Sequence, residues 1–329
     1  MAIDINGNCI VFNGKALCNT PAGAEYAGVI CHQGFCDTRL APVQGSVSGY
    51  SSGGFVPPIV NTVDKFPFAV DGAASDVGEL TVARSGVAGQ SSTVSGYTSG
   101  GSVPPALDTI DKFPFTSDTN ATDVGELTQA RYGAAGQSSV TNGYNTAGET
   151  PTKVDTIDKF PFSSDSNATD VGELTQARVY VAGQSSTEDG YSSGGLAPPD
   201  VSTIDKFPFS ADAPATDVAE LSRSNRITAG QSSLVSGYSS GGDPNVRTID
   251  KFPFSAGTNA TTVGNLTLCI GYAAGQSSTT SGYNSGGLNF GGPNTRINNI
   301  EKFPFSSDTN ASDVGELTQS RNAVTGQQV

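Results

Sequence analysis

The chain repeats one unit about every 47 residues, and this period constrains the fold more than any other feature. A Gly-Tyr pair recurs in steps of 47 residues with one final step of 45, and its tyrosines are Tyr50, Tyr97, Tyr144, Tyr191, Tyr238 and Tyr283. The hexamer IDKFPF follows each pair, as VDKFPF from Val63 in the first copy and as IEKFPF from Ile300 in the last. Repeats of this length bury their apolar faces against their neighbours, so the units must pack side by side.

Each unit contains four short β-like runs separated by turn residues. The runs read AGQSS, GYxSGG, the hexamer and VGELT, and the 329 residues include 41 Gly and 18 Pro. Proline in every hexamer and paired glycines are incompatible with helical repeats of similar length. The pattern predicts an all-β fold, a β-propeller of four-stranded antiparallel blades.

These units resemble kelch repeats. The shared features are an arginine before the first run, an aromatic third run, and paired glycines at 53–54, 100–101, 194–195, 241–242 and 286–287. The resemblance covers residues 38 to 329, although the chain has no Trp and Ala147 replaces one glycine. The near-identical copies and the hexamer also resemble kelch-type repeat proteins of marine bacteriophages. That resemblance implies a virion structural protein, found on the extracellular particle, with other virion proteins as partners.

The two ends decide the number of blades and the domain boundary. Runs two to four occur six times, and residues 321–329 are expected to supply the first run of the first blade. The expected domains are then a hairpin-containing anchoring segment, 1–45, and a kelch-like propeller, 46–329. The open alternative has seven blades, because the nine C-terminal residues and the 38 before Arg39 add up to 47, one further repeat.

The first 45 residues differ in composition from the repeats. They contain Cys9, Cys18, Cys31, Cys36 and the single histidine, His32. Disulfides, free thiols and a zinc site stay open for these cysteines, although the spacing Cys-x8-Cys is unusual for zinc. Asn-Gly within CIVFNGKAL predicts a hairpin, which is expected to dock the propeller on other virion proteins.

The hexamer is expected to build the contacts between blades. Alternation places its two phenylalanines on one strand face, so the twelve hexamer phenylalanines are expected to form the core between blades. Its lysine lies fourteen residues before a glutamate in five copies, which predicts cross-strand structural pairs. The expected pairs are Lys65–Glu79, Lys112–Glu126, Lys159–Glu173, Lys206–Glu220 and Lys302–Glu316.

Binding residues are expected where the copies differ, because the shared residues build the blades. The loops between the second and third runs vary and lie on one face of a propeller. Their distinctive residues are Glu149, Lys153, Asp200, Asp243, Arg247, Phe290 and Arg296. This loop face is expected to bind a host-surface glycan or protein.

Charge and missing motifs exclude several functions. A net charge of −14 disfavours nucleic acid as a partner. There is no catalytic triad, P-loop or nucleophile elbow, so no enzyme, catalytic residue or cofactor is expected. Turn chemistry explains SDTNATD from Ser117 more simply than a calcium loop, so no metal is expected. No apolar run predicts membrane insertion or a secretory signal.

The expected function is a non-enzymatic phage virion protein that displays its propeller for adhesion or decorates the capsid or tail. The alternative is a cellular or secreted propeller that scaffolds protein contacts or binds glycans. Whether it forms a homo-oligomer stays open.

Overall fold

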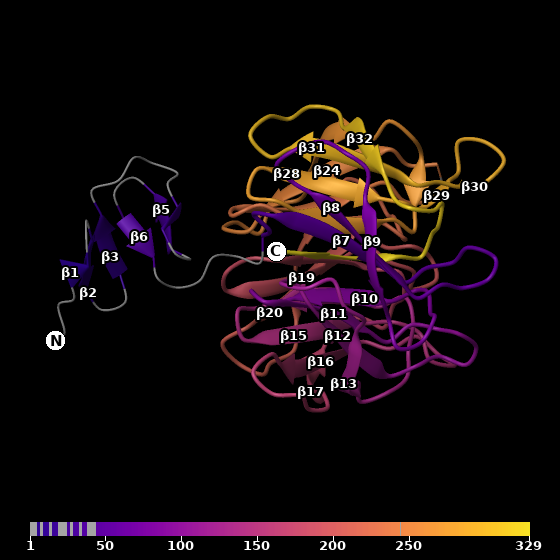
Figure 1. The fold of residues 1–329 in the computed structure, drawn as a ribbon, viewed down its shortest axis with the longest axis horizontal. Coiled ribbons are helices and arrows are strands. Elements are labelled where there is room, and N and C mark those ends of the chain that lie inside the picture. The colour runs from indigo at the N-terminus through magenta and orange to yellow at the C-terminus, as the bar shows by residue number, and fades with distance from the viewer. Residues whose placement is uncertain are drawn as a thin grey trace. The chain divides into compact units, whose positions relative to one another are not determined.

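The computed structural model describes residues 44–243 and 245–329, together with the backbone of six short strands before residue 44 (Figure 1). Contacts divide the chain into two units, Met1–Pro42 and Val43–Val329. Gln44 donates a hydrogen bond from Nε2 to the carbonyl of Ser232 at 2.7 Å, and the N–H of Gly45 donates to Ser277 at 2.8 Å. The second unit therefore begins slightly before the expected boundary after residue 45.

The first unit holds one antiparallel sheet in the order β1-β2-β3-β6-β5-β4. Its strands are β1 (Ile5–Asn6), β2 (Cys9–Phe12), β3 (Lys15–Cys18), β4 (Glu25–Tyr26), β5 (Val29–His32) and β6 (Phe35–Asp37). The predicted hairpin is confirmed, since β2 pairs with β3 and places Phe12 opposite Lys15. The side chains of this unit lie outside the described residues, and with them the state of its four cysteines and His32.

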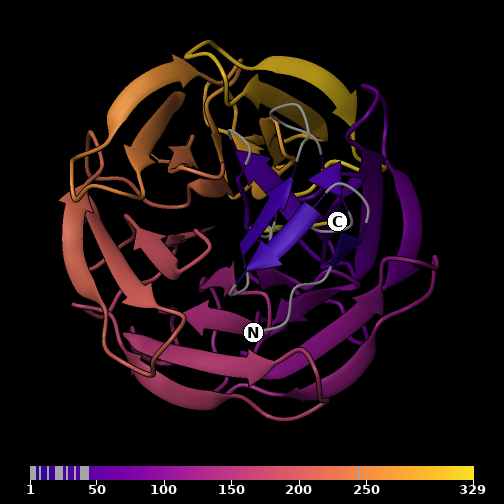
Figure 2. The ribbon, with the colours of Figure 1, turned by 90° about the vertical axis from the view of Figure 1, so that its left-hand side faces the viewer.

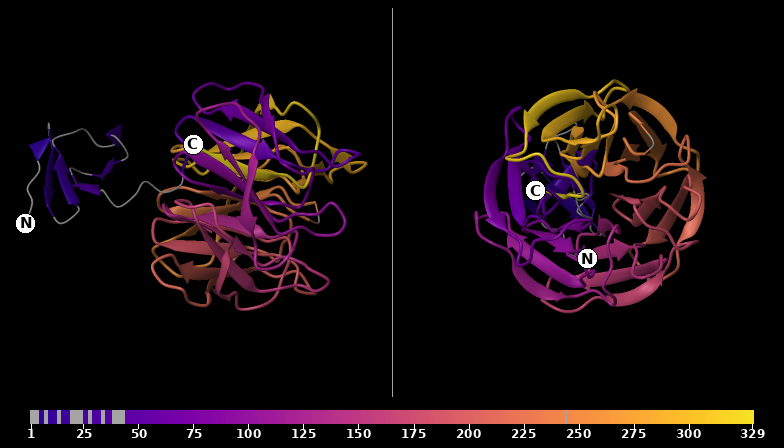
Figure 3. Two further views of the ribbon diagram at one scale, coloured as in Figure 1. Left: turned by 60° about the horizontal axis from the view of Figure 1, so that its bottom comes forward. Right: turned by 90° about the vertical axis from the view of Figure 1, so that its right-hand side faces the viewer.

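The second unit is built from six four-stranded antiparallel sheets, numbered here in chain order, arranged about a central axis (Figure 2; Figure 3). Sheet 1 holds β33 (Thr325–Gln328), β7 (Ser48–Ser52), β8 (Thr62–Pro67) and β9 (Ser75–Glu79). Sheet 2 holds β10 (Ala88–Ser91), β11 (Ser95–Ser99), β12 (Thr109–Pro114) and β13 (Thr122–Glu126). Sheet 3 holds β14 (Ala135–Ser138), β15 (Asn142–Thr146), β16 (Thr156–Pro161) and β17 (Thr169–Glu173).

The remaining sheets repeat this order. Sheet 4 holds β18 (Ala182–Ser185), β19 (Asp189–Ser193), β20 (Thr203–Pro208) and β21 (Thr216–Glu220). Sheet 5 holds β22 (Ala229–Ser232), β23 (Ser236–Ser240), β24 (Thr248–Pro253) and β25 (Thr261–Asn265). Sheet 6 holds β27 (Ala274–Ser277), β28 (Ser281–Ser285), β31 (Asn299–Pro304) and β32 (Ser312–Glu316).

A further three-stranded sheet joins β26 (Ile270–Gly271), β29 (Leu288–Asn289) and β30 (Thr295–Arg296). The described residues contain no helix, and so none that is long and apolar enough to cross a membrane. The architecture is all-β and propeller-like, as the repeat pattern predicts.

Sheet 1 takes its first strand from the end of the chain. β33 pairs with β7 and places Gln327 opposite Tyr50, which confirms that the C-terminal residues complete the first sheet. The last residue lies beside this pairing, because the carbonyl of Val329 accepts hydrogen bonds from Val47 and Ser48. The two ends of the second unit therefore meet in one sheet.

Aromatic rings fill the space between neighbouring sheets. Tyr50 of sheet 1 packs against Phe113 and Phe115 of sheet 2, with ring centroids 5.5 and 4.9 Å apart. Equivalent rings recur around the unit, and Phe66 and Phe68 close it against Tyr283 of sheet 6. This arrangement confirms the hexamer phenylalanines as the core between sheets.

The innermost strands contact one another through their glycines. A methyl group on Gly136 would overlap the carbonyl oxygen of Gly89 in the previous sheet, and each sheet repeats this close approach to its neighbour. The adjacent glutamine crosses the same gap, since Gln90 Nε2 donates to the carbonyl of Tyr144 at 2.9 Å. The sequence AGQS is therefore fixed by contacts between sheets.

Candidate functional site

One end of the central axis is closed by a ring of backbone hydrogen bonds. Six residues, one before each innermost strand, donate N–H to the carbonyl of the equivalent residue in the neighbouring sheet: Gly86, Gly133, Tyr180, Ile227, Tyr272 and Ala323. All six have positive φ, from 55° to 66°. Glycine adopts this conformation freely, whereas it strains a β-branched residue such as Ile227. Strained backbone of this kind concentrates at functional sites, so the ring marks a candidate site.

Large side chains, most of them aromatic, gather on four of the six links that form this ring. The rings of Tyr180 and Tyr272 meet edge to face, with centroids 5.5 Å apart, and Tyr132 lies 6.3 Å from Tyr180. A methyl group on Gly271 would lie 2.7 Å from both Ile227 and Phe290, so these two side chains flank Gly271. We call Tyr132, Tyr180, Ile227, Tyr272 and Phe290 the axial cluster. Its three tyrosines are half-buried, whereas Ser85, Gly86, Asn322 and Ala323 occupy the other two links.

Charged groups border the axial cluster. Arg226 Nη2 lies 2.7 Å from Oδ2 of Asp243, and its Nη1 lies 3.7 Å from Oδ1 of Asp200. Burial raises the pKa of Tyr272, while nearby Arg226 opposes the shift. Burial also raises the pKa of Tyr132, and the adjacent carboxylate of Glu149 adds to that increase. The phenols are therefore neutral hydroxyls at physiological pH.

The structure places four of the seven predicted loop residues at the axial cluster. Glu149, Asp200, Asp243 and Phe290 contact or border it, and Lys153 forms an antiparallel β-bridge with Glu149 across the turn of the same loop.

The two remaining predicted residues are arginines that lie outside the axial cluster. Arg296 stacks over Phe55 at 4.4 Å and donates to Asn322, while the exposed Arg247 donates to the carbonyl of Leu266.

Sequence reasoning missed Tyr132, Tyr180, Arg226, Ile227 and Tyr272. They lie on the links between the last strand of one sheet and the first of the next, whereas the predicted binding residues lie on the loops between second and third strands. The ring places these links beside the predicted loops, as the pairing of Tyr132 with Glu149 shows. A signal was present, because six of the ten tyrosines occupy the equivalent position of the second strand in every copy, and three of the other four fall on these links.

The predicted pairs of lysine and glutamate need correction. The register places Thr62, not Lys65, opposite Glu79, and Lys65 faces Ser75. The lysines instead pair with aspartates, and in all but one case the aspartate belongs to the next sheet. The observed pairs are Lys65–Asp118, Lys112–Asp165, Lys159–Asp212, Lys251–Asp308, Lys302–Asp71 and, within sheet 4, Lys206–Asp189.

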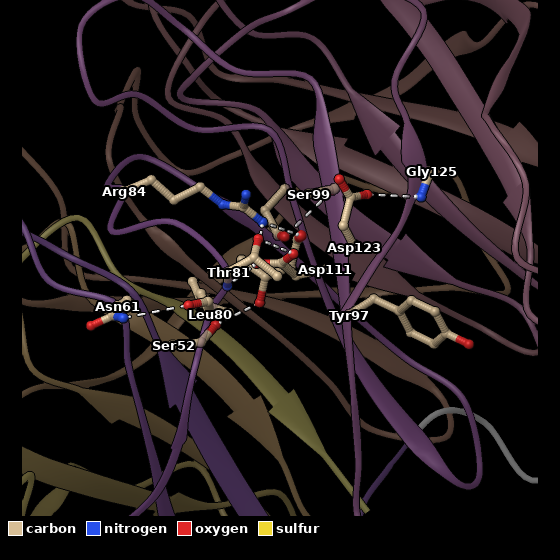
Figure 4. Close-up of polar contacts among 12 residues, drawn as sticks. Ser52, Asn61, Leu80, Thr81, Arg84, Tyr97, Ser99, Asp111, Asp123 and Gly125 are labelled. Carbon is tan, nitrogen blue, oxygen red and sulfur yellow. Dashed lines mark hydrogen bonds and ion pairs between the residues drawn. The ribbon is translucent and has the colours of Figure 1, made fainter. Parts of the chain in front are cut away.

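The hexamer aspartate forms a buried ion pair with an arginine that follows the preceding sheet, and we call this contact the latch (Figure 4). Asp111 of β12 lies 3.1 Å from Nη2 of Arg84, and both side chains are fully buried. The N–H and hydroxyl of Thr81 donate to the same carboxylate at 2.9 and 2.6 Å. Burial lowers the pKa of Arg84, and the carboxylate of Asp111 opposes that shift. Since Thr81 and Arg84 follow sheet 1, the latch joins sheets 1 and 2.

The latch recurs with arginine at four of the six junctions: Arg84–Asp111, Arg131–Asp158, Arg178–Asp205 and Arg321–Asp64. At the other two, Asn225 and Ile270 replace the arginine, opposite Asp250 and Glu301. Glu301 accepts hydrogen bonds from the N–H and hydroxyl of Thr267. Burial raises the pKa of Glu301, and these hydrogen bonds only partly oppose the shift.

This raised pKa gives stability a pH dependence that Glu301→Gln removes. The folded protein holds the Glu301 proton more tightly than the unfolded chain does. The stabilisation that results is therefore fully present below the unfolded pKa, near 4.5, and is lost as pH rises through the folded pKa. We expect the stability of E301Q relative to wild type to increase from pH 4.5 to pH 7.5, measured by urea unfolding. An equal difference at both pH values would contradict this assignment.

Oxygen atoms of the turn SDTNATD, from Ser117, already accept hydrogen bonds or form ion pairs within the protein. Asp118 pairs with Lys65, Asn120 accepts the N–H of Glu79 at 3.1 Å, and Asp123 accepts that of Gly125 at 3.2 Å. Among residues 44–243 and 245–329, no group of three or more His, Cys, Asp or Glu side chains could hold a metal. These turns are explained by the contacts that they make.

Behind the closed end lies a polar cavity of about 140 Å³, lined by the innermost strands. At its opposite end, the N–H of Ser91 donates to the hydroxyl of Ser138, and equivalent bonds continue around the ring. No protein-family model matches the chain, and no curated protein matches it significantly. The candidate site is therefore defined by its geometry, which combines aromatic surfaces with planar polar groups.

Proposed function

We propose that this protein is a non-enzymatic binding protein of a phage particle, with a six-bladed kelch-like propeller that presents the axial cluster to a ligand. In this proposal, the six four-stranded sheets are the blades, and the first 42 residues attach the propeller to other virion proteins. The bacteriophage resemblance of the repeats supports the virion setting. The position of the axial cluster supports the binding role.

The observation that carries the proposal is the asymmetry of the axial ring. Residues shared by all copies build the sheets, so a single binding site must use residues that differ between copies. Tyr132, Tyr180, Arg226 and Tyr272 break the repeat, and they lie on four consecutive links of the six that form the ring. Clustered aromatic residues and arginine are typical of the centres of binding surfaces.

The chain enters the second unit at one end of the central axis. Gln44 and Gly45 bond to Ser232 and Ser277, which lie at the C-terminal ends of their innermost strands. The axial cluster precedes the N-terminal ends of the innermost strands, at the other end of the cavity. The chain thus enters the ring at the end away from the axial cluster, as a displayed binding site requires.

The proposal is tested on phage particles purified from a culture that produces this chain. Mass spectrometry should find the chain in gradient-purified particles. Cryo-electron microscopy should show residues 1–42 against other chains, with the axial cluster facing outward. Recovery only from the soluble cell fraction or the medium would contradict the virion role and favour a cellular or secreted scaffold. An axial cluster covered by the particle would contradict the binding role.

A further inference from the structure

We propose that the ligand of the axial cluster is a neutral carbohydrate. This inference rests on the proposed function and specifies the chemistry that the site recognises. Three properties of the site support it: half-buried aromatic rings, planar polar groups with unfilled hydrogen-bonding capacity, and compensated charge.

The aromatic rings offer surfaces of a kind that sugars use. One face of a pyranose ring carries mainly C–H groups and packs on an aromatic face, while its hydroxyls need polar partners at the edge. Tyrosine suits this because it combines an apolar body with a polar tip. Tyr180 and Tyr272 meet edge to face at 88°, so the two rings present differently oriented surfaces. Tyr132 adds a third ring, tilted by 58° from Tyr180.

The polar groups at the border can bond to hydroxyls. The guanidinium of Arg226 is a planar fork of donors, and Asp243 accepts from its Nε and Nη2 at 3.2 and 2.7 Å. Asp243 occupies only Nε and Nη2 of this guanidinium, and Nη1 lies 3.7 Å from Oδ1 of Asp200, too far for a hydrogen bond. The Arg226 side chain is 33% exposed, so its Nη1 can donate to a ligand hydroxyl.

The charge of the site favours a neutral ligand. Arg226 is already paired with Asp243 and Asp200, so it is not an uncompensated cation for a phosphate, sulfate or carboxylate. A net charge of −14 adds repulsion toward anions. A neutral polyhydroxylated ligand meets no such repulsion.

Other copies of the repeat show which residues can replace the three tyrosines without changing the backbone conformation. Ser85 occupies the position equivalent to Tyr132 in the preceding copy, and Gly86 occupies the position equivalent to Tyr180 and Tyr272. Gly86 and Gly133 have φ near 65°, so glycine fits this backbone conformation. The triple variant Tyr132→Ser, Tyr180→Gly, Tyr272→Gly therefore replaces each tyrosine with a residue found elsewhere in this ring. Val82→Gln is the matched control, because Val82 is exposed on an equivalent link and Gln129 occupies that position in the next copy.

The full-length protein and its variants are first applied to an array of neutral hexose oligosaccharides and sialylated or sulfated ones. The best-bound neutral oligosaccharide is then titrated by calorimetry, and thermal unfolding confirms that each variant is folded. We expect wild type and V82Q to bind neutral oligosaccharides with similar affinity. The triple variant should bind at least about tenfold more weakly, as expected for the loss of several aromatic contacts.

Arg226→Lys distinguishes the geometry of the hydrogen-bond donors from their charge, because lysine keeps the positive charge but lacks the planar fork of N–H groups. We expect R226K to weaken binding to the neutral oligosaccharide. Binding confined to sialylated or sulfated glycans, retained by R226K, would overturn the inference in favour of an anionic ligand. Equal binding by the triple variant and wild type would show that sugar binds elsewhere. Particles that display the axial cluster outward while the protein binds no glycan would refute the carbohydrate alone and leave the proposed function standing.

Discussion

Replacing Asp111 with asparagine is expected to lower the free energy of unfolding by about 3 to 5 kcal/mol, the usual effect of removing one partner of a buried ion pair. Arg84 would keep its charge in a fully buried position and lose its nearest carboxylate, with only Asp123 left in its neighbourhood. Thr81 would lose a charged acceptor for two hydrogen bonds. Urea unfolding at pH 7 measures the effect.

Glu301→Gln is the matched control for this prediction. Glu301 occupies the same hexamer position, but Ile270 stands where the arginine would be. The substitution leaves no cation unpaired, so we expect a change of about 1 kcal/mol or less at pH 7. Equal destabilisation by D111N and E301Q would show that the hydrogen bonds, not the arginine charge, make the latch essential.

A methyl group on Gly136 is expected to destabilise the ring by about 3 kcal/mol, the upper end of the usual cost of overpacking. The added atom would overlap the carbonyl oxygen of Gly89, and that backbone is itself held by Gly326 of the preceding sheet. Neither strand can move aside without disturbing its other neighbour. Thermal or urea unfolding of Gly136→Ala measures this effect.

Gly72→Ala provides the comparison at an uncrowded glycine. No atom lies within 4 Å of a methyl group at that position, and its φ lies outside the left-handed region. We expect G72A to be neutral or slightly stabilising, since alanine restricts the unfolded chain more than glycine. If G136A were as stable as G72A, the tight packing of the innermost strands would be refuted.

The general architecture was predictable because it depends on a pattern repeated along the chain. Proline in every hexamer and paired glycines identify β-structure, and the C-terminal run TGQQV matches the missing first strand of sheet 1. The phenylalanine core followed from strand alternation alone. Each of these inferences needs only the local order of residues.

The ion pairs were not predictable in the same way, because their partners lie in different sheets. Arg84 and Asp111 are 27 residues apart, and Lys112 reaches an aspartate 53 residues away. A reading confined to adjacent strands assigned Lys112 to Glu126 instead. The axial cluster was missed for a related reason, since only the closed ring brings the side chains of Tyr180 and Tyr272, which lie on separate links, into contact.

The pairing of β33 with β7 also governs the order of folding. Gln327 and Ser52 are hydrogen-bonded across 275 residues of chain. Closing a loop of that length opposes folding by roughly 5 kcal/mol from chain entropy alone, and contacts of such high separation form slowly. During synthesis, β7 leaves the ribosome long before its partner exists, so until then it exposes an unpaired edge that can join another chain. Nascent copies on one messenger are therefore at risk of exchanging C-terminal strands, and chaperone binding to early sheet 1 would protect the yield of correctly closed rings.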